Sequence, residues 1–229
     1  MTVDFHAHMH PGADHGCKGS AVAGQQLALA RNAGMGAVVT VSHYYPLQDS
    51  TRSYLERRAL SAEKLGAITA ADGSLPRVFV GSEVTLCHGL EKMEDLHSLC
   101  ISGTDCMLIE MPFCKWDARL IDALEAIKYD LHITPVLAHV DRYDVQDVDA
   151  LLKQGYFGQL NYEGFASLFG KKPLIKWAEK GCIHALGSDI HGTDVGYKNL
   201  DKAKKALGGG LFEDIMAKSC RLLGVREGI

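Results

Sequence analysis

Short apolar runs alternate with longer amphipathic segments along most of the chain. In the first run, 3–8, Val3, Phe5 and Ala7 alternate with polar residues, as in a short strand. The later runs are mostly continuous and rich in aliphatic residues, which is typical of buried parallel strands. They lie at 37–41, 77–81, 106–111, 132–138, 156–160 and 182–187. The pattern therefore predicts seven strands.

Helical segments separate these strands. We expect helices at 20–34, at roughly 51–65, from Asp117 onward, between Asp144 and Gly155, at 173–180 and at 199–221. Ser20 is the expected N-cap of the first helix and Gly34 its end, whereas 84–104 is less regular. The alternation of strands and helices with short glycine-containing connections indicates a parallel sheet or a barrel.

Polar residues suited to a functional site stand where the predicted strands end. They are His6, His8, His43, Glu83, Cys114, His139, Asn161, Asp189 and His191. An open sheet would spread these positions over ~25–30 Å, at ~4.8 Å per strand, whereas the strand ends of a barrel meet on one face. Only closure brings the first and the last strand together, so we expect a barrel.

The first strand and the turn after it have the composition of a metal site. Residues two apart in a strand point to the same face, so His6 and His8 project together. The Pro-Gly pair at 11–12 ends the strand and turns Asp14 and His15 back over its end. Imidazole and carboxylate groups suit divalent zinc, manganese or iron, so a metal site is predicted here.

Composition narrows the class of protein. A chain of 229 residues with 47% hydrophobic and 23% charged residues suits one globular domain, 1–229. The net charge is −4 without any basic run, which argues against nucleic acid as a partner. No apolar segment approaches the ~20 residues of a membrane span. Seven irregularly spaced cysteines indicate reduced thiols, so we expect a cytoplasmic protein without membrane insertion.

The polar motifs, taken in order, resemble those of a known family. They are Asp4-x-His6-x-His8, Pro11-Gly12-Ala13-Asp14, Ser42-His43, Gly81-Ser82-Glu83, the segment 133–143 and Ser188-Asp189-x-His191. This set resembles the polymerase-and-histidinol-phosphatase (PHP) family, and most closely its bacterial tyrosine-protein phosphatases of capsule or exopolysaccharide assembly. The resemblance implies a distorted seven-stranded (β/α) barrel with three divalent metal ions, usually manganese, with iron or zinc in relatives.

The resemblance also implies roles for individual residues. The first metal would be held by His6, His8, Asp189 and Glu83, with Glu83 bridging to the second. The second metal would add His139 and the residue at 114. The third would take His43, His191 and a ligand from the turn, either Asp14 or His15. Arg142 matches the family's phosphate-binding arginine.

Three positions depart from the family pattern. The turn carries Asp14-His15 where the family has two adjacent aspartates, and Cys114 stands where it has a histidine. A Cys114 thiolate would favour zinc or iron over manganese, although a buried thiol without a metal bond is the alternative. Gly196-Tyr197-Lys198 replaces a second arginine. Stabilisation of the transition state is then either weaker or partly supplied by Lys198.

These residues predict phosphate ester hydrolysis. Hydroxide formed from metal-activated water would attack phosphorus, and Arg142 would hold the phosphoryl oxygens. A phenolate, with a parent pKa of about 10, leaves with little help, whereas an alkoxide needs a general acid. His10 and Asp141 are the candidate acids near the mouth of the site, and each is alternatively a solvated rim residue.

The leading hypothesis is a metal-dependent phosphatase that acts on phosphotyrosine in protein. The resemblance implies that its protein substrate is a tyrosine autokinase. The first alternative is a phosphatase for a small phosphomonoester such as histidinol phosphate. An amidohydrolase also uses His-x-His on a barrel strand, but its pattern requires a metal-bridging lysine at the end of a mid-chain strand. Lys115 is near such an end but not at the required position. A catalytically impaired metal-binding regulatory protein is the alternative from a different class.

Overall fold

The seven predicted strands all form. The computed structural model describes residues 1–167, 170–193 and 196–225. The strands are β1 (Val3–His8), β2 (Ala37–Thr40), β4 (Arg77–Val80), β6 (Cys106–Glu110), β7 (Thr134–Leu137), β8 (Phe157–Asn161) and β9 (Ile183–Gly187). Three short strands that the sequence pattern did not predict follow β2, β4 and β9 after two-residue breaks. They are β3 (His43–Tyr44), β5 (Glu83–Thr85) and β10 (Ile190–His191).

All strand pairings are parallel and follow one another round a ring. One sheet has the order β10-β1-β2-β4 and the other has the order β3-β5-β6-β7-β8-β9. The interrupted strands belong to both sheets. The ring closes where β1 pairs with β10, with Ala7 opposite Ile190 and His8 opposite His191. The Asp189 N–H also donates to the His6 carbonyl at 2.7 Å. The architecture is the distorted parallel barrel that the sequence predicted.

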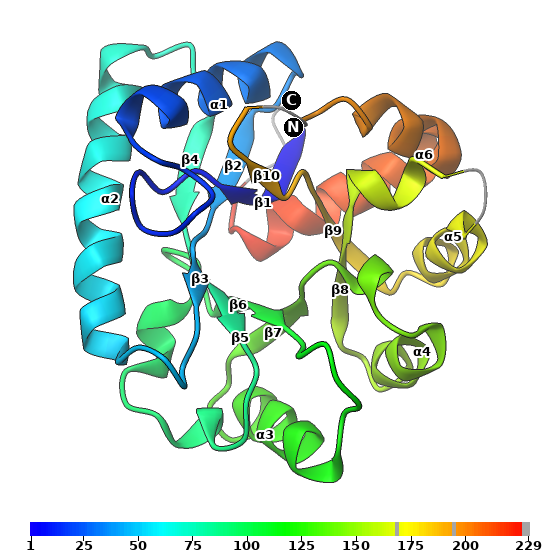
Figure 1. Ribbon diagram of the computed structural model, residues 1–229. Coiled ribbons are helices and arrows are strands. Elements are labelled where there is room, and N and C mark those ends of the chain that lie inside the picture. The colour runs from blue at the N-terminus through cyan, green and yellow to red at the C-terminus, as the bar shows by residue number, and fades with distance from the viewer. Residues whose placement is uncertain (168–169, 194–195, 226–229) are drawn as a thin grey trace.

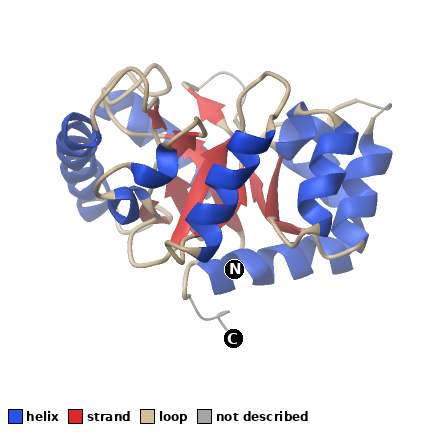
Figure 2. Ribbon diagram, turned by 90° about the horizontal axis from the view of Figure 1, so that it is seen from below, coloured by secondary structure: helices blue, strands red, loops and turns tan. Residues whose placement is uncertain are grey.

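Helices surround this ring of strands (Figures 1 and 2). They are α1 (Ser20–Asn32), α2 (Thr51–Ala71), α3 (Ala118–Tyr129), α4 (Val145–Lys153), α5 (Lys171–Glu179) and α6 (Leu200–Leu222). Helices α3 and α4 begin directly after Asp117 and Asp144, where the sequence predicts them, and both aspartates cap them by accepting backbone N–H groups of the first turn. The irregular segment after β5 holds two 3₁₀ turns, Leu90–Lys92 and Leu96–Leu99. None of the helices in the described part of the chain is long and apolar enough to cross a membrane.

The helices differ from the prediction in several details. The N-cap of α1 is Gly19, and Ser20 is already helical. Helix α2 runs six residues beyond the expected end at Leu65, to Ala71. Its last residues favour the helical conformation but do not repeat apolar residues at helical spacing, so the apolar pattern did not reveal them. Helix α6 is kinked at Gly208, whose φ of 71° lies in the left-handed region that glycine adopts without strain.

Helix α2 braces two of the interrupted strands from behind. The Tyr54 hydroxyl donates to the Ser42 carbonyl at 2.9 Å. The Arg58 guanidinium donates to Ser82 Oγ at 2.6 Å and to the Ser98 carbonyl at 2.7 Å. Ser42 and Ser82 are buried and directly precede His43 and Glu83. The helix therefore fixes the two breaks from which predicted site residues project.

Replacing Arg58 tests this bracing. Arg58→Met should lower the free energy of unfolding by about 1–3 kcal/mol, because two acceptors lose a charged donor. Urea unfolding measures the change. Arg52→Met is the matched control, since Arg52 is 90% exposed and pairs only with Glu56. Its cost should stay within about 0.5 kcal/mol. Equal costs for the two variants would contradict the bracing role.

Candidate metal centre

The carboxylate of Glu83 lies at the centre of the predicted site. Its Oε2 atom is 3.1 Å from His8 Nε2, 3.5 Å from His6 Nε2 and 2.9 Å from His43 Nδ1. Its Oε1 atom is 3.0 Å from His139 Nε2. The side chain is 1% exposed. One buried carboxylate thus contacts four imidazoles from β1, β3 and the end of β7.

The first group of candidate ligands joins the two ends of the barrel. The Nε2 atoms of His6 and His8 are 3.1 Å apart, and each lies 3.5 Å from Asp189 Oδ1. Asp189 follows β9 in a left-handed conformation with φ of 50°. These three residues form a cluster compact enough to hold a metal ion. The predicted convergence of the first and last strands is confirmed.

A second group lies beside β5 and β6. His43, Glu83 and Glu110 form another compact cluster. Glu110 is the last residue of β6, and its Oε1 atom is 3.5 Å from His139 Nε2. Thr85 donates to the other carboxylate oxygen at 2.9 Å, which fixes the side chain.

A third group consists of imidazoles. His8, His43 and His191 form the cluster, with 3.5 Å between the Nε2 atoms of His43 and His191. The ring centroids of His8 and His191 are 4.0 Å apart. His15 stacks on His43 and His191 with centroid distances of 5.0 and 4.9 Å.

Acceptors behind the rings determine which nitrogen is free. Gln159 Oε1 accepts the backbone N–H of His139 at 2.7 Å and lies 3.1 Å from His6 Nδ1. The ring nitrogen Nδ1 of His6 is therefore the donor to this oxygen. Asp14 Oδ2, 3.1 Å from His8 Nδ1, is the corresponding acceptor for His8. The Asp189 carbonyl accepts from His191 Nδ1 at 3.0 Å. In the neutral form of all three rings Nε2 carries the lone pair, as in metal-binding histidines oriented by an outer acceptor.

The donor set fits a divalent cation. Unprotonated Nε2 atoms of His6 and His8 at 3.1 Å repel one another unless a positive charge lies against both. Glu83 Oε2 and His43 Nδ1 are buried and make no hydrogen bond, although they are 2.9 Å apart. Nitrogen and oxygen donors of this kind suit zinc, manganese or iron.

Carboxylates and imidazoles shift one another's pKa values. Burial acts to raise the pKa of Glu83, but the surrounding imidazoles outweigh it and hold the pKa well below the usual value. Burial acts to lower the pKa of His8, but the adjacent carboxylates of Asp14 and Glu83 raise it to about 10. Glu110 and Glu83 likewise raise the pKa of His139 to about 9, against burial. Cations and protons therefore compete for these imidazoles.

Cys114 is outside the candidate centre. The residue is exposed, lies in the loop after β6 and belongs to none of the three clusters. Glu110, four residues earlier, lies in the second cluster instead. Sequence reasoning missed Glu110 because it placed the end of this strand at Met111. The signal was nevertheless present, since Glu110 follows an apolar run just as Glu83 does.

His10 and Asp141 do not reach the mouth of the site, so their predicted position there is wrong. His10 is fully buried between Ser42 Oγ at 3.0 Å and Thr40 Oγ1 at 3.1 Å, and burial lowers its pKa to about 3. Asp141 accepts the Asn161 N–H at 2.8 Å, and burial raises its pKa. Asp141 thereby fixes the end of β8.

The turn after β1 separates its two candidate ligands. Asp14 accepts from His8 Nδ1 and from the His43 N–H through Oδ2, and from the Gly16 N–H at 2.8 Å through Oδ1. Both of its oxygens therefore orient neighbouring groups. His15 instead lines the open pocket over the centre.

The clusters open into a polar pocket of about 490 Å³. Arg142 lines its mouth, is 40% exposed and donates to Asp189 Oδ2 at 2.7 Å. Asn161 donates to the same oxygen at 3.0 Å. At the position of the second family arginine, Tyr197 donates to Asp4 at 2.6 Å, and the exposed Lys198 does not line the pocket. Arg142 therefore supplies the guanidinium group in the lining of the pocket.

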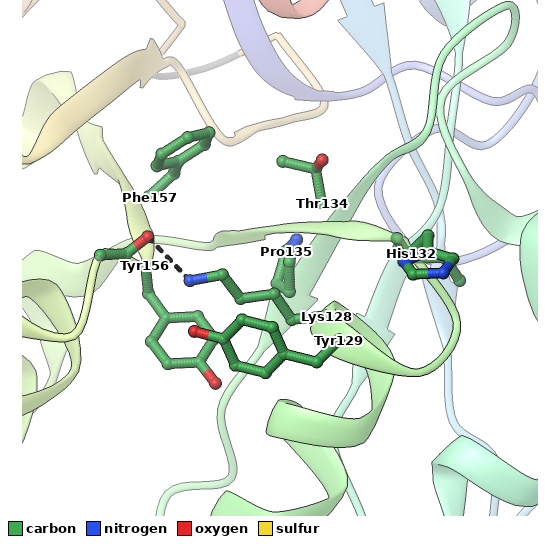
Figure 3. A pocket seen from close by; sticks show the side chains of 9 residues that line it. Lys128, Tyr129, His132, Thr134, Pro135, Tyr156 and Phe157 are labelled. Carbon is green, nitrogen blue, oxygen red and sulfur yellow. Dashed lines mark hydrogen bonds between the residues drawn. The ribbon is translucent and has the colours of Figure 1, made fainter.

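A separate cavity of about 350 Å³ lies at the opposite ends of β7 and β8 (Figure 3). The Lys128 ammonium lies 5.0 and 4.4 Å from the ring centroids of Tyr129 and Tyr156, and it donates to the Gly155 carbonyl at 3.1 Å. No carboxylate lines this cavity. It lacks the donors for a divalent cation.

Known proteins are similar to this chain in sequence and in architecture. The tyrosine-protein phosphatase CpsB of Streptococcus pneumoniae is 25% identical over 211 residues, which cover 84% of either chain. A structure from work on YwqE of Bacillus subtilis and CpsB of S. pneumoniae, described as metal-dependent tyrosine phosphatases, superposes with a TM-score of 0.79 at 20% identity. It covers 99% of this chain and 96% of that one.

Histidinol phosphate phosphatase of Lactococcus lactis, solved with zinc, histidinol and phosphate, has a TM-score of 0.58 at 10% identity. The match covers 90% of this chain and 92% of that one, and it shows a shared fold. The model of the family described as "Capsular polysaccharide synthesis, CpsB/CapC" matches residues 2–220. The chain therefore belongs to the CpsB/CapC family of capsular polysaccharide synthesis proteins.

Proposed function

We propose that the protein is a metal-dependent phosphatase that hydrolyses phosphotyrosine in protein. The observation that carries this proposal is the convergence of free imidazole nitrogens and ionised carboxylates beneath an open pocket that also contains Arg142. Metal charge and a guanidinium together suit a phosphate dianion. CpsB and YwqE, which the chain resembles, are tyrosine phosphatases by name.

Three divalent ions are proposed, one beside each cluster, with ligand sets that include neighbouring residues outside the clusters. His6, His8, Glu83 and Asp189 would hold the first, and Glu83, Glu110 and His139 the second. His43 and His191 would hold the third together with His15, because Asp14 is occupied with orienting His8 and His43. With Glu110 in place of Cys114, no thiolate favours zinc or iron, and manganese is equally suited.

Arg142 would bind the substrate by exchanging partners. Its guanidinium is paired with Asp189 and faces the pocket. A phosphate dianion can accept two parallel hydrogen bonds from a guanidinium. Asn161 continues to donate to Asp189 when Arg142 turns to the phosphate, so the carboxylate stays oriented. Divalent ions held by the clusters would supply positive charge for the phosphoryl oxygens and would lower the pKa of a bound water.

The leaving group separates the proposed substrate from the alternatives. His10 and Asp141 are the acids expected to protonate an alkoxide. His10 is fully buried, Asp141 accepts the Asn161 N–H, and neither lines the pocket. A phenol has a pKa of about 10 and departs with little protonation, whereas an aliphatic alcohol needs a general acid. The geometry therefore favours aryl phosphates over histidinol phosphate.

A tyrosine autokinase in the cytoplasm is the proposed partner, and residues 1–229 form the proposed catalytic domain.

Removing His139 tests the metal centre. His139→Ala should lose at least one metal equivalent and abolish turnover of p-nitrophenyl phosphate, because Glu83 and Glu110 lose their shared imidazole. Elemental analysis of the purified protein measures the loss. His97→Ala is the control, since His97 is exposed in a 3₁₀ turn and should keep both metal and activity. An unchanged metal content in His139→Ala would refute the assignment.

Arg142→Ala tests how the phosphate is bound. Metal content should be retained, while kcat/KM should fall about 10–150-fold, the equivalent of one lost charged hydrogen bond of about 1.5–3 kcal/mol. Arg119→Ala, at a residue 76% exposed beside Asp117, should have no effect. If Arg142→Ala kept full activity, the phosphate would be placed elsewhere.

A pair of variants separates Glu110 from Cys114 as the ligand. Glu110→Gln should lower the metal content by about one equivalent, because a neutral amide replaces a buried carboxylate. Cys114→Ser should leave the metal content and turnover unchanged, because the thiol is exposed outside the clusters. The reverse result would restore Cys114 as the ligand.

A further inference from the structure

An apolar groove of about 390 Å³ lies directly beside the metal pocket. Leu47, Leu86, Pro112 and Leu120 are among the residues that line it. No aspartate, glutamate, lysine or arginine is present in its lining. Its volume is within the range of ligand sites, which are commonly ~300–1,000 Å³ and mostly apolar.

The groove adjoins the metal pocket at a shared residue. Tyr45 lines both, and its ring stacks on His43 with centroids 5.3 Å apart and an angle of 16° between the planes. Thr85 lines the groove and donates to Glu110, which lines the pocket. A substrate with its phosphate at the metals can therefore extend into the groove past Tyr45.

Apolar side chains around this opening are exposed to water. Leu47, which lines the groove, is 81% exposed. Phe113, in the loop after β6, lines the neighbouring cavity and is 68% exposed. Scattered exposed apolar residues are ordinary, but grouped ones at the edge of a site mark contact with a partner. Burial of Leu47 by a bound chain would remove apolar surface from water.

A smaller cavity of about 230 Å³ shares Pro112 and Cys114 with the groove but differs from it in charge. Besides the aromatic rings of Phe113 and Trp116, its lining includes the guanidinium of Arg142 and the carboxylates of Asp144 and Asp147. A substrate segment that carries acidic residues is repelled by these carboxylates. The neutral groove beside Tyr45 is the space that accepts apolar groups.

We propose that this groove binds an apolar side chain next to the phosphotyrosine in a polypeptide substrate. The groove thereby selects peptides with leucine or a similar residue beside the phosphotyrosine over peptides with an acidic residue there. This inference rests on the proposed phosphatase function and specifies its substrate.

Matched peptides and surface variants test the groove. Phosphotyrosyl peptides that differ only in leucine or aspartate at the residue before or after the phosphotyrosine are compared with p-nitrophenyl phosphate. For the native protein, kcat/KM should be about 10-fold higher with leucine at one of the two positions. In both Leu47→Asp and Leu47→Lys, the ratio of kcat/KM for the leucine peptide to that for p-nitrophenyl phosphate should fall about fivefold, mainly through KM.

The control is Leu60→Asp. Leu60 is 59% exposed on α2 and does not line the groove, so the ratio should keep its native value. A fall with Leu47→Asp but a rise with Leu47→Lys would indicate charge rather than apolar contact and overturn the proposal. Equal turnover of all peptides, with p-nitrophenyl phosphate still hydrolysed, would also overturn it while leaving the phosphatase function intact. No turnover of any phosphate ester by the metal-loaded protein would overturn both.

Discussion

The buried carboxylate of Asp4 joins the first strand to the last. It accepts the Ser188 N–H at 2.9 Å, the Ser188 hydroxyl at 2.6 Å and the Tyr197 hydroxyl at 2.6 Å, and it also accepts the His6 N–H. Burial raises its pKa, and these donors partly offset that effect. Asp189 follows directly and donates to the His6 carbonyl. The clusters around Glu83 depend on this junction, because ligands from both ends of the chain meet there.

The sequence predicted the strands better than it predicted where each strand ends. Apolar runs and the polar residue after each were enough to identify His6, His43, Glu83 and Asp189 as neighbours. Glu110 is the last residue of β6 and Cys114 lies four residues further along, and the apolar pattern alone cannot decide which of them faces the centre. His10 continues the two-residue spacing of His6 and His8, but β1 ends at His8, so that spacing no longer sets its direction.

Charge around Glu83 explains why a phosphate ester suits this pocket. Glu83, Glu110 and Asp189 carry negative charge that the imidazoles balance only when protonated. Divalent ions, bound as proposed, would replace those protons and leave the pocket with excess positive charge, to which Arg142 would add. A dianion would be attracted to such a centre, whereas the groove beside Tyr45 has no lysine, arginine, aspartate or glutamate in its lining. In the proposed complex, the two adjoining spaces would then take the phosphate and the apolar part of a substrate, respectively.

Two glycines show how tightly the first strand is held. A Cβ atom on Gly187 would lie 2.6 Å from the His6 Cβ and 2.8 Å from Gln159 Nε2. A Cβ atom on Gly16 would lie 2.3 Å from the His8 Cβ. Larger residues at either position would push a histidine away from its outer acceptor, Gln159 or Asp14. The orientation of the metal-facing nitrogens therefore depends on close backbone approach as much as on the histidines themselves. A histidine lone pair can bind a metal only if the ring directs it at the metal position.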